Sequence, residues 1–119
     1  METQNLTYYE ALKAAEKGQL IARKAWLDVS VFAFQRPSDD LPLKILLSAK
    51  SLPNKLKDYY ERKHQPIVPD NLPKVRFSAY MCLKAYDDSV INGWEPGEDD
   101  ISASDWCVLE SAPKALFSN

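Results

Sequence analysis

The sequence is poor in the residues that build catalytic centres and metal sites. Its 119 residues include one histidine, two cysteines and three glycines. His64, Cys82 and Cys107 are too few and too scattered for a zinc site, and both cysteines stand in apolar runs that predict buried thiols. No phosphate-binding glycine loop and no Gly-x-Ser-x-Gly motif is present. We therefore expect a protein that is not an enzyme and that holds no metal and no cofactor.

The sequence also lacks a long apolar run and an excess of positive charge. Its apolar stretches span only a few residues, too short for a membrane helix, and residues 1–5 have no basic region of the kind that opens a signal peptide. A soluble, cytoplasmic protein is expected. The net charge of −2 counts against a general nucleic-acid binder, because such proteins need a basic face to displace the counterions of phosphates.

The residues that are present predict a small α+β fold. Hydrophobic residues make up 45% of the chain, enough to build the core of one ordinary domain. Thr7 and Glu10 have the spacing of a capping box, which predicts a helix over residues 8–17 that ends at Gly18. Alternating or apolar segments predict strands at 20–22 and 30–35.

The middle of the chain, residues 37–73, is expected to form a helical insertion. Residues 37–40 have turn chemistry, and leucines at helical spacing follow them. Pro53 suits the first position of a second helix, whose buried stripe we expect to be formed by Leu56, Tyr59 and Tyr60. Three further prolines predict an extended loop at the end of the insertion, namely Pro66, Pro69 and Pro73.

The last third of the chain has the pattern of hairpin-connected strands. We expect a long strand over 75–86, a turn at Asp87-Asp88, a partner strand over 89–94 and a last strand over 106–110. An acidic loop covers 95–100. The whole is predicted to be one α+β domain over 1–119, with a core at about 7–110, a tail at 111–119 and an antiparallel sheet.

Three blocks of the sequence resemble a known family. Tyr8-Tyr9-Glu10-Ala11-Leu12 and Gly18 precede Ile21-Ala22-Arg23-Lys24-Ala25-Trp26, which is similar to an opening of the form aromatic-x-Glu-Ala-Leu, helix, Gly, hydrophobic-Ala-Arg-x-Gly-Trp. Residues 80–85, Asn92-Gly93-Trp94 and Asp105-Trp106 resemble the strand, turn and closing Asp-Trp of the same family. The family is that of the Thoeris anti-defence type 2-like proteins, which phages and prophages carry.

The resemblance implies a function. Members of the family look like oligomeric sponges that hold cyclised ADP-ribose immune signals or, in some relatives, cyclic oligonucleotides, in the cytoplasm of the bacterial host. One relative, described as a type II anti-CRISPR, shares the middle insertion. The family's Gly-Trp-Asn-Gly-Lys-Gly loop is Ala25-Trp26-Leu27-Asp28-Val29-Ser30 here, so this chain lacks its glycines and its lysine.

Three aromatic residues are candidate ligand-binding residues: Tyr8, Trp26 and Trp94. The resemblance implies that their rings stack on a base or close a pocket over one. The alternative for each ring is packing in the core. Trp106 stands in an apolar run with residues 107–109, which predicts a core position.

Three polar residues complete the candidate set. Arg23 matches the family's arginine and can pair with a phosphate, or it is a surface charge at a strand end. Asn92 can read the edge of an adenine, or it is the turn residue before Gly93. Asp105 can accept from a ribose hydroxyl, or it caps the segment before the last strand.

Two rivals to the sponge hypothesis stay open at this point. The acidic loop can mimic nucleic-acid phosphates in a protein-interaction inhibitor, for example of a CRISPR effector. An enzyme acting on a nucleotide is the other rival, and the missing acid/base pair counts against it. The lysines and arginines of the insertion are interpreted as solvated helix faces.

Overall fold

The computed structural model describes residues 3–65 and 73–110. The chain divides into two compact units, which are described separately here. Unit 1 comprises residues 1–37 and 79–119, and unit 2 comprises residues 38–78. The expected single domain over 1–119 stays a prediction. The tail at 111–119 and the prolines Pro66 and Pro69 lie outside the described residues.

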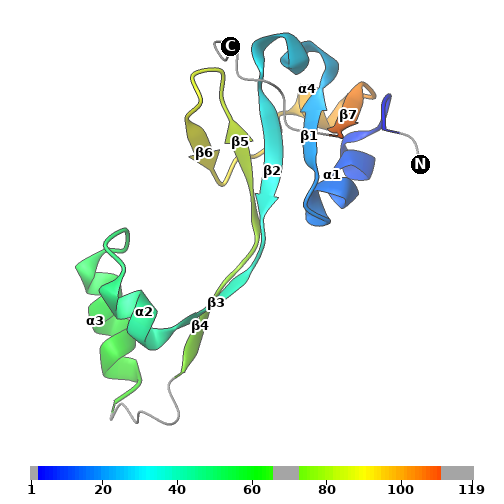
Figure 1. The fold of residues 1–119 in the computed structure, drawn as a ribbon. Helices are drawn as coiled ribbons and strands as arrows, with labels where there is room; N and C mark the ends of the chain where they lie inside the picture. The colour runs from blue at the N-terminus through cyan, green and yellow to red at the C-terminus, as the bar shows by residue number, and fades with distance from the viewer. Residues whose placement is uncertain (1–2, 66–72, 111–119) are drawn as a thin grey trace. The chain divides into compact units, whose positions relative to one another are not determined.

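Unit 1 is a five-stranded antiparallel sheet with one main helix, in the strand order β6-β5-β2-β1-β7 (Figure 1). Its elements are α1 (Tyr8–Glu16), β1 (Leu20–Arg23), the 3-10 helix η1 (Lys24–Val29), β2 (Phe32–Arg36), β5 (Tyr80–Lys84), β6 (Val90–Asn92), α4 (Glu98–Ser102) and β7 (Trp106–Leu109). The central strands place Ile21 opposite Ala33 on one side and Val108 on the other. These three side chains therefore share one face of the sheet.

Helix α1 begins and ends as the sequence predicts. The Thr7 hydroxyl accepts from the Glu10 amide at 3.2 Å, and the Glu10 carboxylate accepts from the Thr7 amide at 2.9 Å. These hydrogen bonds also lower the pKa of Glu10, because they stabilise its charged form. Gly18 follows the helix with a φ of +95°, a backbone conformation that glycine adopts without steric cost.

The core of unit 1 lies between α1 and the sheet, where the helix packs on β1, β2 and β7. Small residues on the inner face of α1 allow the helix to approach the strands closely. Trp106 and Ile21 fill the space below them as the two largest fully buried side chains of this cluster. The buried members of the core are Leu6, Tyr8, Ala11, Ala14, Ala15, Ile21, Ala33 and Trp106.

Unit 2 is a helix pair on a two-stranded ribbon. Strands β3 (Asp39–Pro42) and β4 (Lys74–Phe77) pair antiparallel. The chain between these two strands forms the helices α2 (Leu43–Ser48) and α3 (Asn54–Lys63), which pack on one another. Leu43 and Leu46 are fully buried. The predicted α+β class, with an antiparallel sheet, an N-terminal helix and a helical insertion, is confirmed.

The prediction of one continuous strand over residues 75–86 is wrong. The structure divides it into β4 and β5, with a break at residues 78–79, and the two parts belong to different sheets. The opposite strand is interrupted at the same level, between Arg36 and Asp39. Pro37 explains the break, because proline has no amide hydrogen to donate to a strand ladder.

Three smaller expectations also differ from the structure. Residues 39 and 40, expected in a turn, begin strand β3. Tyr59, expected in a buried stripe, is 55% exposed. The acidic segment, expected as a loop, forms α4, because the Asp100 carboxylate accepts from the Gly97 amide at 3.0 Å and caps this short helix.

Candidate functional site

Three tryptophans meet on one side of unit 1. Trp26 comes from η1, Trp94 follows β6, and Trp106 begins β7. The ring centroids of Trp26 and Trp106 are 5.1 Å apart, and those of Trp26 and Trp94 are 5.8 Å apart, both in edge-to-face geometry. Tyr8 joins the cluster at 5.2 Å from Trp106. Such pairs stabilise a fold beyond the area that they bury.

Trp106 anchors this aromatic cluster. It is fully buried, and its indole Nε1 donates to the Asp100 carbonyl at 2.8 Å, which fixes α4 against the core. The predicted core position of Trp106 is confirmed. Tyr8 is also buried, at 5% exposure, whereas Trp26 and Trp94 are half-buried and keep part of their rings accessible.

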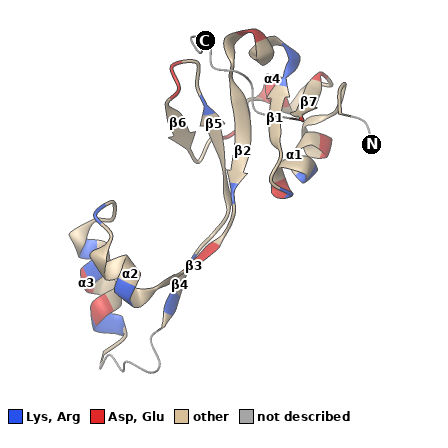
Figure 2. Cartoon of the chain, in the orientation of Figure 1, with Lys and Arg blue, Asp and Glu red and all other residues tan. Residues whose placement is uncertain are grey.

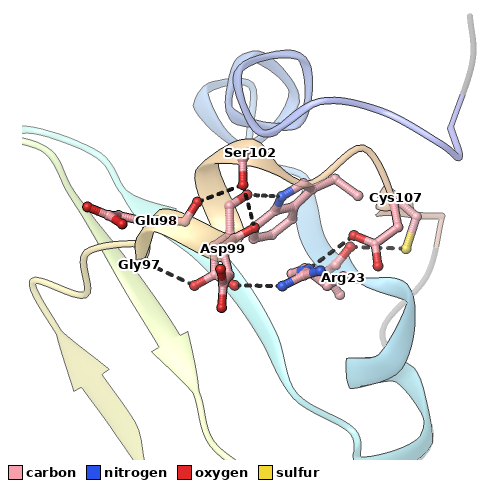
Figure 3. A network of polar contacts seen from close by, with 10 residues as sticks. Arg23, Gly97, Glu98, Asp99, Ser102 and Cys107 are labelled. Atoms are coloured by element: carbon pink, nitrogen blue, oxygen red, sulfur yellow. Dashed lines mark hydrogen bonds and ion pairs between the residues drawn. The ribbon is translucent and has the colours of Figure 1, made fainter.

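Arg23 lies beside the cluster and contacts two carboxylates (Figure 3). Its Nε donates to Asp105 Oδ1 at 3.0 Å, and its Nη1 donates to Asp100 Oδ1 at 3.2 Å. The Arg23 side chain is 27% exposed. Because both carboxylates face the same cation, the local charge around Arg23 is negative rather than positive. An added phosphate would have to compete with Asp100 and Asp105 for this side chain.

The electrostatics of the site follow from these contacts. The hydrogen bond to Asp105 raises the pKa of Arg23, with a smaller contribution from Asp100. Burial raises the pKa of the Cys107 thiol, and the negative charge of Asp105 acts in the same direction. Burial likewise raises the pKa of Tyr8, with contributions from Tyr9 and Asp100. Both Cys107 and Tyr8 are therefore held in their neutral forms.

A pocket of about 390 Å³ opens next to this network. Asp105 stands in its wall and is the one predicted site residue among those that line it. Lys24 supplies a cation, Gln4 and Asn5 supply amides, and Leu27 is among the apolar contacts. The full lining is Gln4, Asn5, Lys24, Leu27, Asp105, Cys107, Val108, Leu109 and Glu110.

The position of the pocket follows from the local backbone. The Lys24 amide donates to the Asp105 carbonyl at 3.2 Å, so the start of η1 is tied to the segment before β7. Leu6 pairs with Trp106, and the Val108 amide donates to the Thr3 carbonyl at 2.8 Å. The N-terminal segment is thereby held along the outer edge of β7, beside the pocket.

The structure brings together five of the six predicted site residues. Tyr8, Trp26 and Trp94 meet around Trp106, and Arg23 contacts Asp105. Asn92 is separate from this group. It lies on strand β6, where its side-chain oxygen accepts from the Cys82 thiol at 3.4 Å. Its role in reading an adenine, like the ligand roles of the other five, stays a prediction.

The sequence did not point to Asp100 or to the residues other than Asp105 that line the pocket. Lys24 falls at the unspecified position after the family's arginine, and only the fold shows that it borders a cavity. Gln4 and Asn5 precede the first helix and carry no motif. Asn5 has a φ of +57°, a left-handed conformation that asparagine tolerates better than most residues, but the sequence alone does not reveal it.

Three further findings concern the described residues only. Within 3–65 and 73–110, no group of three or more His, Cys, Asp or Glu side chains is placed to hold a metal ion. Both cysteines are buried free thiols, as predicted, and the Cys107 thiol donates to the Ala22 carbonyl at 3.2 Å. In the part of the chain that the structure describes, no helix has the length and apolar character needed to cross a membrane.

Fold and site together define a small α+β protein with a pocket at one edge of an antiparallel sheet, beside a tryptophan cluster. A family model for the Thoeris anti-defense 2-like domain matches residues 6–109 of the chain. The protein therefore belongs to the Thoeris anti-defense 2-like family. None of the curated proteins matches the chain. The resemblance found in the sequence is confirmed by the family match.

Proposed function

We propose that the protein acts against Thoeris-type defence by sequestering a nucleotide-derived immune signal, which it does not cleave. The ligand class is a cyclic ADP-ribose isomer or a cyclic oligonucleotide. The observation that carries the proposal is membership of the Thoeris anti-defense 2-like family over residues 6–109. The protein acts in the cytoplasm of the bacterial host, where such signals are made.

The pocket beside β7 supports this proposal by its size and chemistry. Its volume of about 390 Å³ lies within the range of small-molecule sites. Lys24 is exposed, and the described residues include no ion-pair partner for it, so its charge is available to a phosphate. Asp105 can accept from a sugar hydroxyl, and the amides of Gln4 and Asn5 can both donate and accept.

The tryptophan cluster supports a second part of the binding surface. Trp26 and Trp94 are half-buried, so their accessible ring surface can stack on a base. Tyr8 is almost fully buried and packs on Trp106, which in turn packs on Trp26. Its contribution to ligand binding is to hold these two rings in place. Arg23 holds Asp105 at the pocket wall. Asn92 lies on β6, at the opposite edge of the sheet, and its adenine contact stays a prediction.

Release of an intact ligand is part of the proposal. The chain's one histidine, His64, follows α3 in unit 2, and the pocket lining contains no serine or threonine. The thiol in the lining, Cys107, has a pKa raised by burial and by Asp105, so it is held in its neutral form, which is a poor nucleophile. We also propose that the protein is a homo-oligomer whose pockets are completed between subunits. A pocket at the edge of a sheet in so short a chain has room for a wall from a second copy. Light scattering at micromolar concentrations tests this, and a strictly monomeric protein would contradict it.

Calorimetric titration with cyclic ADP-ribose isomers and with cyclic di- and trinucleotides tests the function. We expect one class to bind and Lys24→Ala to weaken that binding. Lys17→Ala, at the residue after α1, should leave it unchanged as a matched control, since Lys17 is exposed and outside the pocket. The bound compound should be recovered unaltered after heat denaturation. Absence of binding across the panel overturns the proposal, and a linearised product formed with turnover makes the protein an enzyme.

A second candidate function rests on the exposed acidic surface around α4. Glu95, Glu98 and Asp99 are all exposed, as a protein-interaction inhibitor that mimics phosphates would require. Nuclease assays of a type II CRISPR effector with and without the protein test this function. Inhibition that is lost in Glu98→Gln/Asp99→Asn, with signal binding unchanged, would favour the inhibitor.

A further inference from the structure

Charge is distributed unevenly between the two units. Residues 38–78 contain eight Lys and Arg against five Asp and Glu, a net charge of +3. The remaining residues contain seven Lys and Arg against twelve Asp and Glu, a net charge of −5. The overall value of −2 therefore hides one basic and one acidic unit. Figure 2 shows the basic residues of unit 2 on α2, α3 and β4.

One face of α3 concentrates this basic charge around an exposed aromatic ring. Lys55, Tyr59, Arg62 and Lys63 recur at intervals of three, four or one residues and line an open hollow of about 730 Å³ together with Asp58. Tyr59 is 55% exposed, and Lys63 Nζ lies 5.7 Å from the centroid of its ring. From Lys55 to Lys63 the stripe is about 12 Å long, at the helical rise of about 1.5 Å per residue. We call these four residues the basic stripe.

The cations of the basic stripe are available to a partner. Within residues 3–65 and 73–110 no carboxylate lies within ion-pair distance of Lys55, Arg62 or Lys63. Arginine and tyrosine are the residue types that most often dominate a protein interface, and arginine binds carboxylates through two parallel hydrogen bonds. The stripe therefore has the composition of a docking surface for an acidic protein segment.

The chain itself contains a matching acidic segment. Glu95, Glu98 and Asp99 are exposed in and before α4, and the side chain of Glu98 points away from Arg23 (Figure 3). Asp100, by contrast, is already held by Arg23. Each copy of the protein thus offers one basic and one acidic surface at equal concentration, which favours pairing between unlike surfaces of two copies.

A nucleic acid fits the basic stripe less well. Asp58 stands in the middle of the stripe and would repel a phosphate backbone. The net charge of −5 on unit 1 would also repel a polyanion. A folded partner with a limited acidic patch avoids both penalties.

We propose that the basic stripe of one copy docks on the acidic α4 segment of a second copy, defined by Glu95, Glu98 and Asp99. This proposal is independent of the ligand, because the basic stripe lies outside the candidate pocket. Each copy contributes both surfaces, so it can make this contact with another copy through either one. The association is electrostatic and weakens with salt.

Sedimentation velocity over a concentration series, in 50 mM and 500 mM salt, tests the proposal with two charge-reversal variants. Lys55→Glu/Arg62→Glu makes the stripe acidic, and Glu98→Lys/Asp99→Lys makes the α4 segment basic. Each variant alone should lose the salt-sensitive step of self-association, with the dissociation constant of that step raised at least about tenfold, whereas assembly through the pocket edge of unit 1 is unaffected. A mixture of the two variants should form a heterodimer, because each reversed surface then meets an unlike one. Lys44→Glu/Lys50→Glu, with the same charge change outside the stripe, should behave as wild type.

Several results would overturn the proposal. A salt-sensitive association step that keeps its wild-type dissociation constant in Lys55→Glu/Arg62→Glu would place the contact elsewhere, and a mixture that does not recover this step would exclude the α4 segment as the occupant. Binding of a labelled dT20 oligonucleotide that depends on Lys55 and Arg62, without self-association, would make the stripe a nucleic-acid surface. Melting curves of each variant establish that it is folded. Ligand titration, which reads the pocket of unit 1, fails or succeeds separately from this test.

Discussion

The Arg23 guanidinium lies 3.0 Å from the Asp105 carboxylate, and this hydrogen bond joins the end of β1 to the residue before β7. The same guanidinium holds Asp100 in α4. One side chain thus connects three elements that meet at the tryptophan cluster. Arg23 is therefore more than a surface charge at a strand end, because its hydrogen bonds hold together segments that are far apart in the sequence.

Arg23→Ala should lower the free energy of unfolding by about 1–2 kcal/mol, because two charge-assisted hydrogen bonds are lost at a site that is only partly exposed. Urea denaturation measures the change. Lys24→Ala, at the neighbouring exposed position, should stay within about 0.5 kcal/mol of wild type. Equal stabilities of the two variants would show that the Arg23 contacts contribute nothing net.

Trp26→Ala should cost about 2–4 kcal/mol of stability, because the ring packs edge-to-face on both Trp94 and Trp106. Trp26→Phe should retain most of that packing. If Trp26 also stacks on the ligand, the Phe variant separates the two roles: it stays folded and binds more weakly by up to about 1–3 kcal/mol, the range for stacking on a base. Melting and titration of both variants give the answer. A Phe variant with unaltered affinity would restrict Trp26 to the core.

The protein should lose stability in alkaline solution. Tyr8 and Cys107 both have raised pKa values in the folded state, against ordinary values of 10.0 and 9.0. Their contribution to stability is therefore fully present below the unfolded pKa and is lost as the pH rises through the folded pKa. Melting temperatures measured from pH 7 to pH 11 should fall from about pH 9 upward. Tyr8→Phe should flatten the upper part of this decline, and a decline of unchanged slope would contradict the role of Tyr8.

Replacing Ser30 by glycine should maintain or raise the stability of the protein. It ends η1 with a φ of +56°, in the left-handed region, at the position where the family pattern has glycine. Relief of this conformation is worth about 1 kcal/mol, partly offset by the greater chain entropy of unfolded glycine. Ser30→Gly should therefore match or exceed wild type in thermal stability, whereas Ser30→Val should lose about 1–3 kcal/mol at the same buried position. A glycine variant that melts clearly lower would show that the serine side chain has a structural role.

The helix over residues 8–16 and most strands of unit 1 are predictable because their signals are local. A capping box, a glycine after the helix and alternating side chains act within a few residues of one another. The break at residues 78–79, by contrast, has no signal in the residues around it. The pattern from Val75 to Tyr86 alternates without interruption, and only the pairing with a strand that contains Pro37 divides it between two sheets.

The candidate site is less predictable for a related reason. Asp100 and Arg23 are 77 residues apart, and no spacing rule connects them. Trp106 was assigned to the core from its apolar neighbours, and this is confirmed because burial follows hydrophobic sequence closely. The same rule gave the wrong prediction for Tyr59, which is exposed although it is a large aromatic residue. A short amphipathic helix such as α3, which packs on α2, leaves large side chains exposed.

Arg36 pairs with Tyr80, and Asp39 pairs with Phe77, so the chain leaves the five-stranded sheet and returns to it at adjoining positions. A segment inserted between such positions alters neither the register nor the strand lengths on either side. A change in the length of this segment therefore leaves intact the strand pairing that positions the pocket of unit 1.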